Sequence, residues 1–178
     1  MLAAALAKAA GATRGEGFAV VAPMDGFHLP NSVLDARGLR PVKGAPETFD
    51  AEGFVRLLRR AREEPEATVR WPEFHRELDE PTPEAIVITP TAKLVITEGN
   101  YLLLDRPWWR EVRPLLDAVW YIGARREVLR RRLLARQLTA GRSEEAAVRH
   151  VDGSDLPNAE LVEQSRGLAD RVVHLDGP

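Results

Sequence analysis

The sequence predicts an α/β fold in which helices cover both faces of a parallel sheet. Short apolar runs, each the length of one buried strand, alternate along the chain with segments of helical periodicity. This alternation is typical of parallel sheets buried on both sides. The length of 178 residues and the apolar content of 44% suit a single domain, residues 1–178, with an ordinary core.

The composition excludes several classes of protein. A net charge of −2 gives no overall attraction to nucleic acid or to an anionic membrane. The absence of cysteine excludes disulfides and thiol nucleophiles, and four histidines alone give no credible zinc site. The apolar segment 1–10 contains Lys8 and stops at Gly11, which predicts a capped helix rather than a membrane span. We therefore expect a cytoplasmic protein without nucleic-acid or membrane partners, and we leave a homodimer open.

The first half of the chain is expected to begin with that helix and one buried strand. The strand is the apolar run 18–24, which ends at Asp25. Residues 26–48 are rich in Pro, Gly and Arg and contain about one helical turn at 31–36, and loops of this length are usually functional or disordered. A helix then opens at Phe49-Asp50, with its apolar residues on one face.

The second half continues the alternation of strands and helices. In order, we expect an irregular stretch at 71–83, strands at 85–88 and 94–97, a helix at 107–116, a strand at 118–122, helices at 125–138, from 143 and at 156–169, and a strand at 171–175. Ligands of parallel sheets bind at the carboxyl ends of the strands. Asp25, Glu98 and Gly123 stand at such ends.

Two acidic residues therefore follow buried strands directly. A carboxylate such as Asp25, followed by a glycine, is suited to accept a proton from a hydroxyl or to hold a metal ion, although an Asp that caps a turn has the same appearance. Glu98 has the geometry of an acid that orients Mg²⁺ or its water shell. Two such residues in one sheet favour a shared site over two turn caps.

Arginines are concentrated on the predicted helix 125–138. Most of them suit a solvated face. Arg132 and Arg136 are four residues apart and share a face, so together they could clamp a triphosphate. His28 and His75 could contact a substrate, but an isolated histidine is more often structural.

Four segments together resemble one family of kinases. They are 23–29 (Pro-Met-Asp-Gly-Phe-His-Leu), 43–50 (Lys-Gly-Ala-Pro-Glu-Thr-Phe-Asp), 98–103 (Glu-Gly-Asn-Tyr-Leu-Leu) and the Arg-rich helix with the Gly-Arg that follows it. In this order they resemble the uridine kinase, pantothenate kinase and phosphoribulokinase group, and within it bacterial proteins described as nucleoside, nucleotide or fructose kinases. The resemblance covers essentially the whole chain.

The resemblance implies a P-loop NTPase fold and transfer of the γ-phosphoryl group of ATP to a hydroxyl of a small metabolite, with Mg²⁺. Asp25 then corresponds to the general base and Glu98 to the strand-end acid near the metal. The residues that correspond to substrate contacts are His28, Phe49, Phe74, Arg76 and Tyr101. The residues that correspond to the nucleotide-binding arginines of a lid, at 125–155, are Arg132, Arg136 and Arg142. His75 stands where the family usually has an Asp.

The sequence departs from the family at its start. The family begins with a strand and a Gly-x-x-x-x-Gly-Lys-Ser/Thr loop, and this chain contains no Gly-Lys pair. Segment 2–7 resembles the helix that follows the loop, so we expect a start site placed too late or a truncated sequence, and poor ATP binding by the chain as numbered. The alternatives are a non-catalytic metabolite-binding relative and a nucleotide hydrolase, and Asp25 argues against the hydrolase.

The acceptor is left open by the sequence. A nucleoside, a sugar and a pantothenate-like alcohol all require the same base and the same metal ion.

Overall fold

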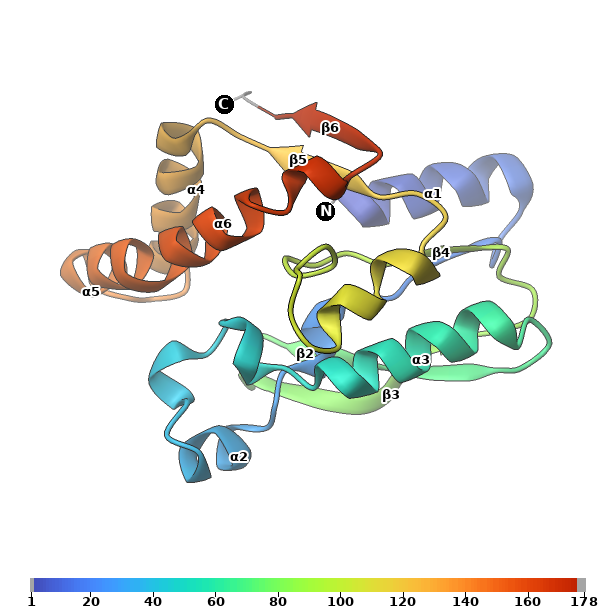
Figure 1. Ribbon diagram of the computed structural model, residues 1–178, viewed down its shortest axis with the longest axis horizontal. Coiled ribbons are helices and arrows are strands. Elements are labelled where there is room, and N and C mark those ends of the chain that lie inside the picture. The colour runs from blue at the N-terminus through green and yellow to red at the C-terminus, as the bar shows by residue number, and fades with distance from the viewer. Residues whose placement is uncertain (1, 176–178) are drawn as a thin grey trace. The chain divides into compact units, whose positions relative to one another are not determined.

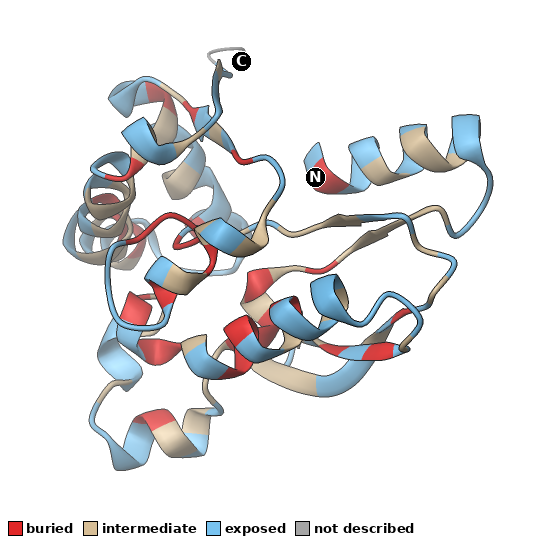
Figure 2. Cartoon of the chain, turned by 45° about the vertical axis from the view of Figure 1, so that its right-hand side comes forward, coloured by how far each residue is buried: buried red, intermediate tan, exposed pale blue. Residues whose placement is uncertain are grey.

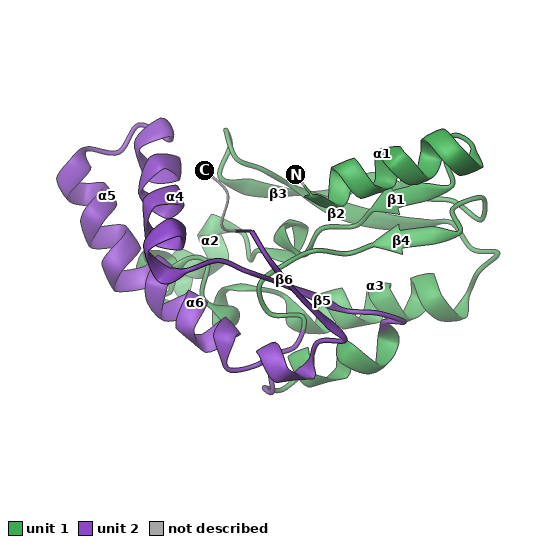
Figure 3. Ribbon diagram, turned by 90° about the horizontal axis from the view of Figure 1, so that it is seen from above, with its two compact units in different colours: residues 1–102, 107–115 green, residues 103–106, 116–178 purple. Residues whose placement is uncertain are grey.

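The chain divides into two compact units, which Figure 3 distinguishes by colour. The computed structural model describes residues 2–175. Unit 1 comprises Met1–Leu102 and Pro107–Leu115, and unit 2 comprises Leu103–Arg106 and Leu116–Pro178. Within residues 2–175, no helix is both long and apolar enough to span a membrane.

Unit 1 contains three helices and four strands (Figure 1). In chain order they are α1 (Leu2–Arg14), β1 (Ala19–Val21), α2 (Asn31–Ala36), α3 (Ala51–Glu63), β2 (Val69–His75), β3 (Glu80–Ile88) and β4 (Leu94–Ile96). Short 3₁₀ turns lie at Met24–Phe27, Arg40–Val42, Pro46–Thr48, Trp109–Glu111 and Arg113–Leu115.

Unit 2 contains two strands and three helices. They are β5 (Trp120–Gly123), α4 (Arg126–Thr139), α5 (Glu144–His150), α6 (Leu156–Glu163) and β6 (Arg171–His174). A π-helical turn at Val151–Asp155 joins α5 to α6, and a 3₁₀ turn at Arg166–Leu168 precedes β6.

The parallel strands occur as two hydrogen-bonded pairs, β1 with β4 and β5 with β6. In unit 1, Ala19 is opposite Leu94 and Val21 is opposite Ile96, and α1 packs on this pair (Figure 1). The predicted α/β fold with parallel strands and flanking helices is confirmed.

The region 71–88 differs from the prediction. The stretch 71–83, predicted to be irregular, and the strand predicted at 85–88 form one antiparallel hairpin of β2 and β3 instead. Prolines concealed the hairpin, because proline lacks the N–H that a ladder needs. Pro72 is tolerated because the register of the ladder shifts between Trp71 and Glu73, which leaves Pro72 at the irregularity.

The prediction of a helix at 107–116 was also wrong. The structure has two short 3₁₀ turns there, Trp109–Glu111 and Arg113–Leu115. Pro114 cannot donate a backbone hydrogen bond to the preceding turn, which prevents a continuous α-helix. By contrast, α3 begins as predicted, because the Asp50 side chain accepts a hydrogen bond from the backbone N–H of Gly53 at 2.9 Å.

The core of unit 1 is an aromatic cluster between α3 and the β2–β3 hairpin, and Figure 2 shows buried residues on both the helix and the hairpin. Phe54 and Trp71 are fully buried, and Phe27 packs edge-on against both, with ring centroids 5.2 Å and 5.0 Å away. The indole N–H of Trp71 donates to the carbonyl of Pro23 at 2.9 Å. This bond ties the core to the segment that carries Asp25.

Gly26 is required where that segment crosses the hairpin. A Cβ atom at Gly26 would lie 2.1 Å from the carbonyl oxygen of Pro72. We therefore expect Gly26→Ala to lower the unfolding free energy of the 178-residue chain by about 1–3 kcal/mol. Gly11→Ala is the control, because a Cβ there meets no atom within 4 Å and alanine favours the helix by about 0.5–1 kcal/mol. Urea denaturation measures both variants, and equal midpoints would contradict the close approach.

Candidate functional site

Asp25 lies in the 3₁₀ turn Met24–Phe27, which follows β1 after Ala22 and Pro23. Its carboxylate accepts a hydrogen bond from the guanidinium of Arg76 at 3.3 Å, and its backbone carbonyl accepts one from Nδ1 of His28 at 2.8 Å. The Asp25 side chain is 36% exposed. It is therefore held in place and still accessible to a substrate.

Glu98 follows β4, the strand that pairs with β1. Beyond the regular ladder, the N–H of Met24 donates to the carbonyl of Glu98 at 2.8 Å, and the hydroxyl of Thr97 donates to the carbonyl of Ala22 at 2.7 Å. These bonds keep the two strand ends together. Burial raises the pKa of the Glu98 carboxyl, and the negative charge of Asp25 raises it further. The two predicted acids therefore lie close enough to interact.

Three rings lie beside Asp25. The imidazole of His28 is 4.0 Å from the ring of Phe49 and 4.6 Å from the ring of Phe74, measured between centroids. His28 and Phe49 face each other in an isolated β-bridge. The predicted substrate contacts His28, Phe49, Phe74 and Arg76 thus gather in unit 1 around Asp25.

Tyr101, predicted to contact the substrate, is fully buried. Its hydroxyl donates to the carbonyl of Gly44 at 2.5 Å, and its ring packs edge-on against Phe49 at 5.7 Å. These contacts hold Tyr101 against Phe49 and against the backbone at Gly44. His75, the departure from the family pattern, lies at the end of β2, where its Nε2 is 4.0 Å from the carboxylate of Glu73.

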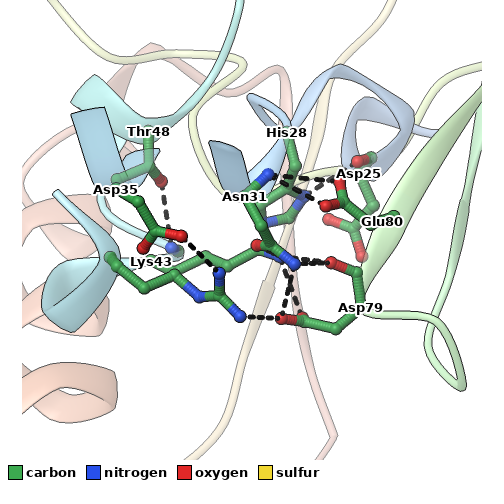
Figure 4. Close-up of polar contacts among 10 residues, drawn as sticks. Asp25, His28, Asn31, Asp35, Lys43, Thr48, Asp79 and Glu80 are labelled. Carbon is green, nitrogen blue, oxygen red and sulfur yellow. Dashed lines mark hydrogen bonds and ion pairs between the residues drawn. The ribbon is translucent and has the colours of Figure 1, made fainter. Parts of the chain in front are cut away.

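A polar network that the sequence did not reveal joins the loop 28–49 to the tip of the β2–β3 hairpin (Figure 4). The ammonium of Lys43 lies 2.9 Å from the Asp79 carboxylate and donates to the Asp79 carbonyl at 2.6 Å and to the Asn31 side chain at 2.7 Å. The backbone N–H of Asn31 donates to Glu80 at 3.0 Å. The only available signal was the scarcity of lysine, since the chain contains three lysines and one of them is Lys43.

Asp79 is the centre of this network. It adopts a left-handed backbone conformation with φ of 51°, and it also accepts from Asn31 Nδ2 and lies 3.5 Å from the guanidinium of Arg40. The network fixes the loop against the hairpin and thereby fixes His28 relative to Phe74.

The predicted lid arginines lie in unit 2. The guanidinium of Arg136 is 3.3 Å from the carboxylate of Asp155, which is only 14% exposed and also accepts from Gln137 at 2.9 Å. Arg132 is on α4, and Arg142 follows the helix, with its backbone N–H donating to the Gln137 carbonyl at 3.2 Å. Arg130, also on α4, forms two hydrogen bonds with Asp152 at 2.8 Å and 2.9 Å.

The carboxylates of Asp25 and Glu98 suit a magnesium ion that binds together with a nucleotide. Residues 2–175 contain no group of three or more His, Cys, Asp or Glu side chains arranged to hold a metal. Mg²⁺ needs no such group, because it is usually bound by one or two carboxylates together with water and substrate phosphates. Asp25 and Glu98 repel each other electrostatically, and a cation beside them would relieve that repulsion.

The neutral form of His28 is favoured at this site. Burial lowers the pKa of the His28 imidazole below its ordinary value of 6.5, although the Asp25 carbonyl and charge oppose this shift. The unfolded chain therefore binds a proton here before the folded chain does, so we expect the unfolding free energy to fall as the pH drops below 6.5.

His28→Asn tests this expectation, since asparagine retains an N–H for the Asp25 carbonyl and cannot titrate. Urea midpoints at about pH 7.5 and about pH 5.5 should differ less in the variant than in the parent chain. A His28 ring-proton titration with a pKa at or above 6.5 would contradict the shift.

Curated proteins of similar sequence include several named as kinases, whereas no protein-family model matches the chain. The chain is 38% identical to the ATP-dependent kinase-like protein notR′ of Aspergillus versicolor, over 80% of this chain and 88% of that protein. It is 33% identical to "Putative uridine kinase C227.14" of Schizosaccharomyces pombe, over 97% of this chain and 76% of that protein. It is 40% identical to the uncharacterized protein YggC of Escherichia coli over 86% of its own length, and it spans only 62% of YggC.

A solved structure shows the same fold. The crystal structure of the "putative fructose transport system kinase" from Silicibacter sp. TM1040 matches with a TM-score of 0.88 at 41% identity, over 97% of this chain and 82% of that one. The names of these relatives and the shared fold agree with the resemblance found in the sequence. The chain belongs to the P-loop kinases of the uridine kinase-related group.

Proposed function

We propose that this protein transfers the γ-phosphoryl group of ATP to a hydroxyl of a small metabolite. The observation that carries the proposal is the pairing of β1 with β4, which brings Asp25 and Glu98 together beside the predicted substrate contacts. Ligands of parallel sheets bind at this end of the strands. The names of the relatives support ATP as the phosphoryl donor.

Asp25 is the proposed general base. The acceptor hydroxyl gives its proton to the Asp25 carboxylate while its oxygen bonds to the γ-phosphorus. The bond from that phosphorus to the β–γ bridging oxygen breaks, and ADP leaves with the electron pair. Arg76, 3.3 Å from Asp25, holds the carboxylate in position.

Glu98 is the residue proposed to hold Mg²⁺, directly or through a water molecule. The ion, when bound, supplies positive charge for the phosphates of ATP. Arg132, Arg136 and Arg142 are proposed to neutralise charge on the transferred group and to exclude water.

The chain itself contains no Gly-x-x-x-x-Gly-Lys-Ser/Thr loop, so the proposal concerns the protein expressed from its complete natural reading frame. If that frame encodes no such loop before Met1, the alternative is favoured, a non-catalytic relative that binds the metabolite but cannot hold a triphosphate.

The experiment measures ADP release from MgATP by the protein expressed from its complete reading frame, with pooled nucleosides, sugars, sugar phosphates and hydroxy acids as acceptors. We expect ADP release that depends on one pool and on Mg²⁺. Metabolite binding by calorimetry without any acceptor-dependent ADP release would favour the non-catalytic alternative.

A further inference from the structure

The rings beside Asp25 leave no space for an inserted planar base. A base between two aromatic rings needs contacts of about 3.5 Å on each face, so the rings must stand about 7 Å apart. The His28 ring lies 4.0 Å from Phe49 and 4.6 Å from Phe74, tilted by 42° and 41°, so a base does not fit between His28 and either ring.

The spacing of His28 and Phe49 is fixed by the backbone. Residues at a β-bridge are direct neighbours, and this bridge is flanked by two hydrogen bonds, from Leu29 to Thr48 at 2.9 Å and from Asp50 to Phe27 at 2.8 Å. Phe49 is also buried against Tyr101. Opening a slot beside Phe49 would break these bonds or its core packing, and either change is costly.

Phe74 is restrained on its own side. It is opposite Pro81 in the β2–β3 ladder, and the Lys43 ammonium lies 5.0 Å from its ring centroid. Lys43 is in turn bound to Asp79. The contacts that fix the loop against the hairpin therefore also keep Phe74 against His28.

The charges at the site disfavour an anionic acceptor. Lys43 is 13% exposed and already neutralised by Asp79 at 2.9 Å, so it is not available to a substrate anion. Near Asp25, the negative charge of Asp25 acts on the carboxyl of Glu98, and the guanidinium of Arg76 pairs with Asp25. An anionic group placed beside these two carboxylates would be repelled by them.

The remaining polar groups suit hydroxyls. The carboxylate of Asp25 accepts hydrogen bonds, and the guanidinium of Arg76, 74% exposed, donates them. Adjacent hydroxyls on a carbon chain offer one donor and one acceptor each, which matches this pair of groups. We propose that the acceptor is a neutral polyol of the monosaccharide class, rather than a nucleoside held by base stacking or an anionic alcohol; this rests on the proposed kinase function.

The test compares kcat/KM for three classes of acceptor, with the protein expressed from its complete reading frame and saturating MgATP. The classes are neutral pentoses, hexoses and sugar alcohols; uridine, cytidine and adenosine; and pantothenate, glycerate and sugar phosphates. We expect the best neutral polyol to exceed the best member of the other classes about tenfold or more, the equivalent of about 1.4 kcal/mol.

A nucleoside or an anionic alcohol with equal or higher kcat/KM would overturn the inference and leave the kinase function standing. Absence of ADP release with every class would overturn the kinase function itself. The KM of the preferred acceptor should also stay constant between about 0.02 M and about 0.5 M salt, whereas screening would raise the KM of an acceptor whose anionic group is held by attraction to the protein.

A matched pair of variants tests the role of Arg76. Arg76→Ala should raise the KM of the neutral acceptor about tenfold through the loss of a hydrogen-bond donor. Arg70→Ala, in the same strand region, should leave that KM unchanged, because Arg70 is exposed and pairs only loosely with Glu84 at 3.7 Å. If Arg76→Ala impairs anionic acceptors and spares neutral ones, the acceptor carries an anion and the inference fails.

Discussion

Asp25→Asn should lower kcat by about 10²–10⁴-fold, the usual contribution of a positioned general base, in the protein expressed from its complete reading frame. Asparagine keeps the size of the side chain and an oxygen that can accept from Arg76, so the turn Met24–Phe27 should remain intact. The capacity to take the acceptor proton is lost, together with the negative charge that pairs with Arg76. Steady-state kinetics with the preferred acceptor measures the effect.

The affinity for ATP separates this role from a structural one. The proposed work of Asp25 is on the acceptor, so calorimetry should find MgATP binding nearly unchanged in Asp25→Asn. Asp35→Asn is the matched control, since Asp35 is 60% exposed and pairs with Arg40 on the surface at 3.4 Å, and its turnover should stay near that of the parent. Turnover of Asp25→Asn within a few-fold of the parent would mean that Asp25 is not the base.

The adjacency of Asp25 and Glu98 could be predicted because it follows from local pattern. Each residue ends an apolar run, and the carboxyl ends of neighbouring parallel strands lie on the same edge. The helix α3 could be predicted for a similar reason, because Asp50 caps it and its apolar residues recur with helical spacing. In both cases each element is marked by a pattern of a few neighbouring residues.

The network around Asp79 could not be predicted in this way. Lys43 and Asp79 are 36 residues apart, and their contact depends on the β2–β3 hairpin, whose prolines conceal it in the sequence. The left-handed conformation of Asp79 arises at the tip of that hairpin. The self-packed rings of His28, Phe49 and Phe74 likewise depend on the bridge that closes the loop between residues 28 and 49. Such long-range contacts have no local pattern.

The second large effect on kcat is expected from substitutions of the lid arginines. In the protein expressed from its complete reading frame, Arg136→Ala and Arg132→Ala should each lower kcat by about 10³-fold and change the KM of the acceptor little. An arginine that stabilises charge on a transferred phosphoryl group contributes about this much. Arg130→Ala and Arg131→Ala should be nearly silent, because exposed arginines and exposed ion pairs contribute little.

The contacts within unit 2 make Arg130→Ala a matched control for Arg136→Ala. Arg136 and Arg130 lie on the same helix and each pairs with an aspartate, Asp155 and Asp152 respectively. Loss of an ion pair alone would therefore affect both variants, whereas loss of a phosphate contact would affect Arg136→Ala only. A Tm measurement on each variant identifies any effect of leaving Asp155 with fewer partners. If all four alanine variants retain kcat within a few-fold of the parent, α4 is a solvated structural helix and its arginines do not act on the phosphates.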